Sequence, residues 1–118
     1  MAAPPADLLY QRALSLYDLR RYPEAENELR KALAQEPNRA DAHAYLALAL
    51  LAQTGPSGPL PYRLEEALRE ARRAVGLRPD AALGYIALAW ACLAARKPDD
   101  ALRAAAQALR IDPQSIQG

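Results

Sequence analysis

The fold is decided by residues 82–113, which read ALGYIALAWACLAARKPDDALRAAAQALRIDP. The part before Arg96 has no charged residue and is rich in alanine and leucine, which is typical of a helix that other elements cover on every side. A second alanine-rich segment starts near Pro98, a residue favoured in the first turn of a helix, and stops before Pro113. The Asp99-Asp100 pair places negative charge where the helix dipole favours it. The stretch therefore predicts a helix–turn–helix unit.

The same unit occurs twice more, upstream in the chain. The prolines that close the second segment of each unit are separated by 42 and then 34 residues, and they are Pro37, Pro79 and Pro113. On the first segments the separations come in the reverse order, since the alanines there are 34 and then 42 residues apart, at Ala13, Ala47 and Ala89. Both series fit a period of 34 residues with eight extra residues in the middle unit, between Leu50 and Ala67.

The extra residues fall in the segment QTGPSGPLP, residues 53–61. Its prolines and glycines break helices and predict an extended loop. Phenylalanine is absent and β-branched residues are few, so no sheet is expected. Helices are expected over residues 6–19, 23–36, 40–53, 63–78, 82–95 and 98–111.

Three copies of this pattern resemble the tetratricopeptide repeat, in which large apolar and small residues occupy fixed places on two helices and a proline follows. The first copy matches with Leu9, Ala13, Leu16, Ala25, Leu29, Ala32 and Pro37. The second matches with His43, Leu46, Ala47, Leu50, Ala67, Ala71, Ala74 and Pro79. The third matches with Tyr85, Leu88, Ala89, Cys92, Ala101, Ala105, Ala108 and Pro113. Departures from the family pattern are Arg12, at a usually apolar place, and Arg20 and Arg96, at the usual turn glycine.

The resemblance implies an all-α protein, a right-handed superhelical solenoid of about six helices in a single domain, residues 1–118. Its repeats would cover about residues 6–39, 40–81 with the insertion 53–61, and 82–115. Small residues let neighbouring helices approach closely, and a bulkier residue would overpack the contact. The expected repeat-packing residues are Ala13, Ala25, Ala32, Ala47, Ala67, Ala74, Ala89, Ala101 and Ala108.

Composition argues against several classes of function. Fifteen basic and fourteen acidic residues give a net charge of +1, which does not attract nucleic acid or an anionic membrane. His43 and Cys92 are the only residues of their kinds and both fall at core places of the repeat, so we expect no catalytic residue, no metal site and no cofactor. The sequence predicts a protein that is not an enzyme, is not inserted in a membrane, and belongs in the cytoplasm. A removed signal peptide or a membrane-anchored parent protein stays open as an alternative.

The inner surface of the solenoid is the expected functional site, because this surface receives a peptide or helix in the family. A stripe at helical spacing on the first helix of each repeat gives the groove residues Tyr10, Leu14, Tyr17, Leu48, Leu51, Ile86, Trp90 and Leu93. Family members that clamp acidic peptides carry basic residues here, so an apolar or amphipathic helix or peptide is the better-matched partner. Asp7, Asp18 and Asp41, near the same face, would orient a basic partner.

Three alternatives remain open from the sequence alone. The groove and the last helix, with Leu102, Leu109 and Ile111 expected to be exposed, would also suit a self-association module that builds a homo-oligomer. Such an uncovered end also fits a fragment of a longer repeat protein. Alternatively, tight curvature would bury Trp90 and its neighbours within the chain, and no apolar groove would remain.

Overall fold

The computed structural model describes residues 4–55 and 58–114, without the side chains of residues 54 and 55. The helices in this part of the chain are α1 Ala6–Asp18, α2 Tyr22–Gln35, α3 Ala40–Ala52, α4 Pro61–Leu77, α5 Ala82–Ala94 and α6 Pro98–Ile111. Every helix boundary lies within two residues of the position expected from the sequence, and the all-α fold is confirmed.

The insertion differs from the expected loop. Residues Thr54–Gly55 (β1) and Gly58–Pro59 (β2) pair as antiparallel strands, with Thr54 opposite Pro59 and Gly55 opposite Gly58. The expectation of no sheet was therefore wrong by this one short ribbon. Residues that cannot continue a helix still form ladder hydrogen bonds when the chain must reverse between two helices. Helix α4, which follows the hairpin, starts at Pro61, two residues earlier than expected.

Prolines and turns set the helix ends. Helices α2, α4 and α6 each stop two residues before the closing proline of their repeat, as expected from its clash with a continuing helix. Helices α1 and α5 end differently, with Arg20 and Arg96 in the left-handed region at φ 62° and 61°. The amides of Arg21 and Lys97 then bond back to carbonyls of the preceding helix, over 2.8 and 2.9 Å. This is the Schellman arrangement, with arginine where glycine is usual.

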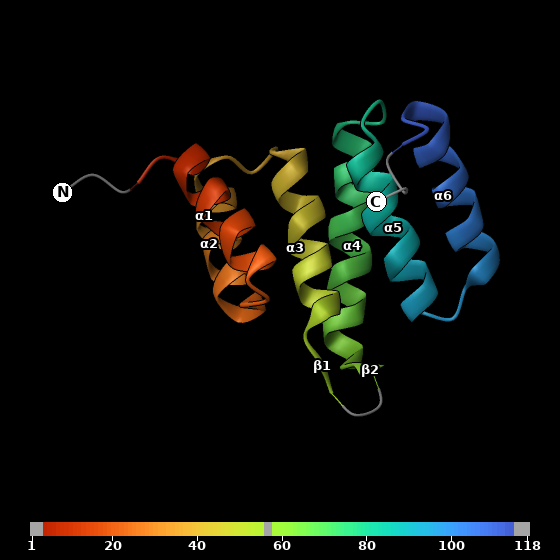
Figure 1. Ribbon diagram of the computed structural model, residues 1–118, viewed down its shortest axis with the longest axis horizontal. Helices are drawn as coiled ribbons and strands as arrows, with labels where there is room; N and C mark the ends of the chain where they lie inside the picture. The colour runs from red at the N-terminus through yellow and green to blue at the C-terminus, as the bar shows by residue number, and fades with distance from the viewer. Residues whose placement is uncertain (1–3, 56–57, 115–118) are drawn as a thin grey trace.

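The helices stack as three antiparallel pairs in chain order, from α1 and α2 at one end to α6 at the other (Figure 1). Helix α3 packs against α2, α4 and α5, whereas α1 touches it only slightly. The stack measures 48 × 34 × 24 Å. The β1–β2 hairpin joins the C-terminus of α3 to the N-terminus of α4 and projects from the stack there (Figure 1). Helices α1, α3 and α5 form the inner row of the solenoid.

Alanine contacts hold the stack together. Eight of the nine expected packing alanines are at most 5% exposed, and the five most deeply buried are Ala25, Ala32, Ala47, Ala67 and Ala108. Ala89 is the exception and is only half-buried. It lies in the last repeat, where no further helix of the described chain packs. For the same reason Leu102, Leu109 and Ile111 are exposed.

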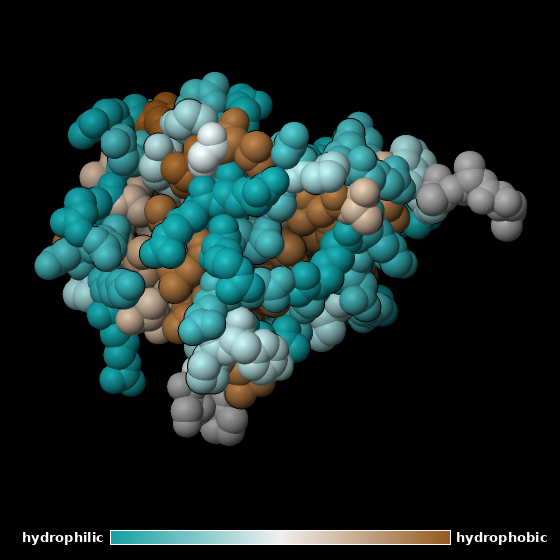
Figure 2. Space-filling model, turned by 180° about the vertical axis from the view of Figure 1, so that it is seen from behind, coloured by the Kyte–Doolittle hydropathy of each residue, from teal (hydrophilic) through white to brown (hydrophobic). Residues whose placement is uncertain are grey.

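Charged residues cover the outer side of the stack. Arg30 of α2 donates two hydrogen bonds to Glu66 of α4, over 2.8 and 3.0 Å, and so joins the first two repeats. The side of the molecule opposite that of Figure 1 is mostly hydrophilic, and hydrophobic side chains show in the hollows between polar ones (Figure 2). The amphipathic pattern of α2, α4 and α6 therefore faces its polar side to water.

Candidate functional site

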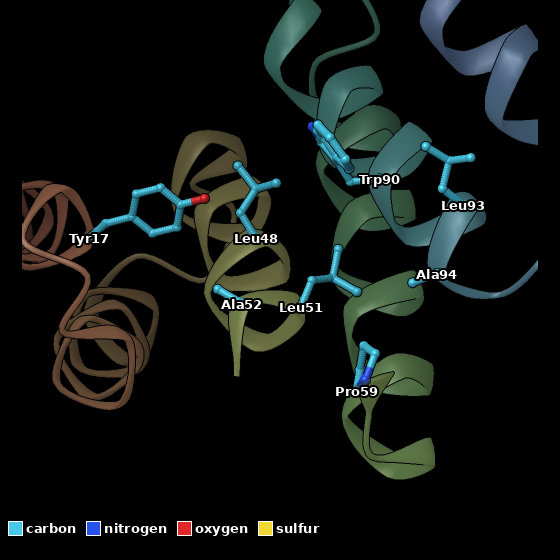
Figure 3. A pocket seen from close by; sticks show the side chains of 8 residues that line it. All are labelled: Tyr17, Leu48, Leu51, Ala52, Pro59, Trp90, Leu93 and Ala94. Atoms are coloured by element: carbon cyan, nitrogen blue, oxygen red, sulfur yellow. The ribbon is translucent and has the colours of Figure 1, made fainter. Parts of the chain in front are cut away.

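A cavity of about 440 Å³ opens on the inner helices, at their C-terminal ends. Helix α1 contributes one side chain, α3 three, α5 three and the hairpin one (Figure 3). The lining residues are Tyr17, Leu48, Leu51, Ala52, Pro59, Trp90, Leu93 and Ala94. None of them is charged, so the cavity is an apolar surface with the Tyr17 hydroxyl pointing toward Leu48.

Helical spacing explains why these residues meet. Leu48 and Leu51 lie one turn apart on α3, as do Trp90 and Leu93 on α5, and Tyr17 occupies the corresponding place in the last turn of α1. Five of the eight groove residues expected from the sequence thus line one cavity.

The other three expected groove residues do not line this cavity. Tyr10 is buried at 8% exposure, beneath the Arg39 guanidinium, whose carbon lies 4.4 Å from the ring centre. Leu14 and Ile86 are half-buried. All three sit at least one turn before the cavity residues of their helices, so the cavity occupies only the C-terminal part of the predicted stripe.

Trp90 is 58% exposed and Leu93 is 53% exposed. The alternative in which curvature covers these side chains within the chain does not hold in the structure. Helix α5 is apolar all round, yet its inner side, with Trp90 and Leu93, borders the cavity. A tryptophan exposed to this extent beside a hollow marks a surface suited to another apolar group.

Pro59 of the hairpin closes the cavity beside Leu51 and Ala52 (Figure 3). The hairpin is held in place at both ends by one carboxylate on α2. Gln53 Nε2 and Arg63 Nη1 both donate to Glu26 Oε1, over 2.7 and 3.2 Å. Although burial opposes the charge, hydrogen bonds from Gln53 and Arg30 leave the pKa of Glu26 lowered. Sequence reasoning recognised the insertion but could not assign it to a wall of the groove, because nothing local specifies a contact with α2.

A cluster of tyrosines fills the space between α1 and α3, next to the cavity. Tyr45 meets Tyr10 and Tyr17 edge to face, with ring centres 6.0 and 5.6 Å apart. Tyr22 of α2 meets Tyr17 in the same way at 5.2 Å. Burial raises the pKa of Tyr10, Tyr17 and Tyr45, so these rings keep their protons at neutral pH. Tyr45 was not among the expected groove residues, because the stripe at helical spacing with Leu48 and Leu51 passes through its neighbour Ala44.

The acidic residues of the inner row differ in their partners. Arg39 binds Asp7 Oδ1 at 2.7 Å and Asp41 Oδ1 at 2.9 Å, so both carboxylates are ion-paired. Asp18, the last residue of α1, is exposed and forms no ion pair within the described part of the chain. Of the three aspartates that the sequence placed near the groove, only Asp18 presents an unpaired charge.

His43 occupies a structural place in the core. Its Nε2 lies 2.7 Å from the carbonyl oxygen of Pro37, and its Nδ1 meets the carboxylate of Glu70 on α4. Both partners accept hydrogen bonds, so they favour the charged ring, which donates from both nitrogens, and the pKa of His43 is raised. The ring is buried, at 6% exposure, and ties the α2–α3 turn to α4.

Other kinds of site find no support among residues 4–55 and 58–114. No group of three or more His, Cys, Asp or Glu side chains there has the arrangement that a metal ion needs. In the same residues no helix combines the length and apolar character that crossing a membrane requires.

Comparison with solved structures finds the same fold elsewhere. The first tetratricopeptide domain of Spaghetti (RPAP3) bound to the HSP90 peptide SRMEEVD superimposes with a TM-score of 0.79 at 18% identity, over 94% of this chain and 82% of that one. The structure of Naa15/Naa10 bound to HypK-THB gives 0.77 at 21% identity, over 95% and 16%. MamA from Desulfovibrio magneticus RS-1 gives 0.73 at 24% identity, over 95% and 59%. The chain thus spans only part of the latter two.

Family models agree with the structural match. No curated protein matches the sequence. Two models described as "Tetratricopeptide repeat" match residues 10–55 and 82–115, which together make up more than half of the chain. The unmatched part between them contains most of the insertion and helix α4. With three stacked helix pairs, alanine contacts at the repeat positions and these matches, the chain belongs to the tetratricopeptide repeat family.

Proposed function

We propose that the protein is a non-enzymatic scaffold that holds an apolar or amphipathic segment of another protein in the cavity on its inner helices. The observation that carries the proposal is the exposed Trp90, which stands beside a cavity lined without any charged residue. The family fold is one that binds proteins and peptides, and similar domains are solved with a bound peptide or protein partner.

The energetics require a partner that fills the cavity. Full burial of a large apolar side chain stabilises by about 1.5–3 kcal/mol. Trp90 and Leu93 are each about half exposed, so covering both contributes about 1.5–3 kcal/mol together. Association costs several kcal/mol or more. A stable complex must therefore also use Tyr17, Leu48 and Leu51, which favours a segment long enough to cross from α5 to α1.

The cavity is poorly suited to an acidic peptide such as the one bound to the Spaghetti domain. No Lys or Arg lines it, and carboxylate recognition relies on such groups. Arg12, the basic residue of α1, lies on a different surface with Leu8 and Leu16. Arg39 is occupied by Asp7 and Asp41. An apolar ligand matches the lining better than a carboxylate does.

Trp90 is the only tryptophan of the chain, so its fluorescence reports directly on the cavity. We expect a short amphipathic peptide with leucines along one face to shift the Trp90 emission to shorter wavelength in a saturable way. Leu48→Glu, inside the cavity, should abolish the shift. Leu109→Glu, on an exposed part of α6, is the matched control and should leave it unchanged. No shift with leucine-faced peptides, or a shift indifferent to Leu48→Glu, would contradict the proposal.

A second candidate, self-association, is favoured by a separate observation. The outer end of the stack exposes Leu102 by 69%, Leu109 by 41% and Ile111 by 37%, all on α6. A second copy could cover these side chains and the neighbouring cavity. Sedimentation at several concentrations distinguishes the candidates. A dimer broken by Leu102→Glu and by Trp90→Glu supports self-association, whereas a monomer that binds the peptide supports the scaffold.

A further inference from the structure

The charges around the cavity restrict the kind of segment it can hold. The lining itself is uncharged, and the nearest unpaired charge on the inner helices is Asp18, which follows the cavity residue Tyr17. The two other aspartates of the inner row are bound to Arg39. On the inner helices, Asp18 is therefore the unpaired carboxylate that lies next to a cavity residue in the chain.

Aromatic rings surround the same end. Tyr17 contacts Tyr22 and Tyr45 edge to face, with ring centres 5.2 and 5.6 Å away. Asp18 directly follows Tyr17 on α1, and its charge contributes, after burial, to the raised pKa of Tyr45 and, after burial and the neighbouring Tyr22 and Tyr45 phenols, to that of Tyr17. Tyrosine faces attract ammonium and guanidinium groups, and a neighbouring carboxylate strengthens that attraction.

The dipoles of the inner helices also favour a cation at the cavity. The cavity lies at the C-terminal ends of three inner helices, since Ala52 and Ala94 are the last residues of α3 and α5, and Tyr17 is the last but one of α1. None of these helices has a basic residue in its last turn. Helix C-termini carry partial negative charge and favour cations.

Basic residues do occur in the turns that follow. Arg21 is paired with Glu24, and Arg20, Arg96 and Lys97 are exposed. None of the four lines the cavity. Asp18 also lies outside the lining, and of the unpaired basic residues only Arg20 belongs to the same turn as Asp18, after α1.

From this combination we propose that the partner is an apolar segment carrying a basic side chain, whose ammonium or guanidinium group docks against Asp18 and the Tyr17–Tyr22–Tyr45 rings while its apolar side chains cover Trp90. The inference rests on the proposed scaffold function and specifies the chemistry of its ligand. An acidic or uncharged apolar segment of the same shape binds more weakly.

Two probe peptides test the inference. Both have the same leucine face, and one carries lysines where the other carries glutamates at the ends. Trp90 emission gives the dissociation constants at low ionic strength. On the unmodified protein the lysine peptide should bind about threefold to tenfold more tightly. Salt of about 1 M, where the Debye length is about 3 Å, should remove most of the difference.

Substitutions of Asp18 assign the effect to this position. Asp18→Asn should reduce the preference for the lysine peptide, and Asp18→Lys should reverse it. Asp99→Asn is the matched control, since Asp99 is an exposed aspartate at the start of α6, outside the cavity. Equal binding of the two peptides, unaffected by Asp18, would overturn the inference and leave the scaffold intact. Failure of both peptides to shift Trp90 would instead overturn the scaffold proposal on which the inference rests.

Discussion

The ring of His43 on α3 donates a hydrogen bond to the carboxylate of Glu70 on α4, and its other nitrogen donates to the carbonyl of Pro37. An imidazole with two hydrogen-bond acceptors thus replaces the large apolar or aromatic side chain usual at this place of the repeat. Burial opposes the charge and Arg73 adds to that opposition, but the bonds to Glu70 and Pro37 outweigh both and raise the pKa of His43.

This bond predicts a pH-dependent stability. The folded-state pKa of His43 lies above about 6.5, the value in an unfolded chain. The stabilisation is therefore fully present below about pH 6.5 and is lost as the pH rises through the folded-state pKa. The free energy of unfolding in urea, measured from pH 5.5 upward, should fall across that window, and His43→Gln should remove the fall.

Titration of the imidazole by NMR tests the cause directly, because His43 is the only histidine. Glu70→Gln should lower the pKa of His43, whereas Glu65→Gln, on an exposed position of the same helix, should not. A wild-type pKa at or below about 6.5 would show that the ring is not held charged.

The hairpin wall of the cavity should depend on Glu26. Glu26→Gln weakens the shared acceptor of Gln53 and Arg63 and should lower the free energy of unfolding by about 1–2 kcal/mol. Hydrogen exchange should also speed up in residues 53–63. Glu24→Gln on the same helix is the control, since Glu24 is exposed, pairs with the exposed Arg21 and should change little.

Low pH should weaken the same contact between Glu26 and the hairpin. The pKa of Glu26 is lowered by folding, so its contribution is present above the unfolded value, about 4.3 for glutamate, and is lost as the pH falls through the folded-state pKa. Unfolding curves between pH 5 and pH 3 should show a steeper loss of stability for the wild type than for Glu26→Gln. Parallel curves would mean that the carboxylate does not anchor the hairpin.

The turn arginines predict a gain of stability. Arg96 and Arg20 adopt a positive φ that costs a side-chain-bearing residue about 1–2 kcal/mol. Glycine avoids this cost, but it loses more conformational entropy on folding, which cancels part of the gain. Arg96→Gly should raise the free energy of unfolding by about 0.5–1 kcal/mol. Arg96→Ala keeps the Cβ atom and should give no such gain. Thermal unfolding of the two variants side by side would decide the matter.

Overpacking should be graded along the stack. Ala47→Leu inserts bulk where Ala47 is fully buried, and should cost about 1–3 kcal/mol or more. Ala89→Leu, at the corresponding place of the last repeat, should cost less because Ala89 is only half-buried. Ala34→Leu, exposed on α2, should cost almost nothing. Equal costs at Ala47 and Ala89 would show that the last repeat is covered as tightly as the second.

The helices were predictable because their signals are local. Periodic alanines, the closing prolines and the positive-φ positions each act within a few residues, so the boundaries could be read to within two residues. Arg20 and Arg96 were also readable as replacements for the turn glycine, and in the structure both adopt the left-handed conformation.

The extent of the cavity was not predictable in the same way. A stripe of equal spacing runs along the whole of α1. The position of Tyr45 and the ion pairs of Arg39 decide that Tyr10 is buried whereas Tyr17 lines the cavity. These contacts join residues on different helices and depend on how far α1 leans from α3. The placement of Pro59 likewise depends on Glu26, a residue of another repeat.

The hairpin adds residues between two helices without removing any repeat position. Its length and composition are therefore free to change while the alanine register of the solenoid stays the same. Exchanging this segment for one of another size would deepen or shorten the groove at one end. The cavity thus has one wall that does not belong to the alanine register of the repeats.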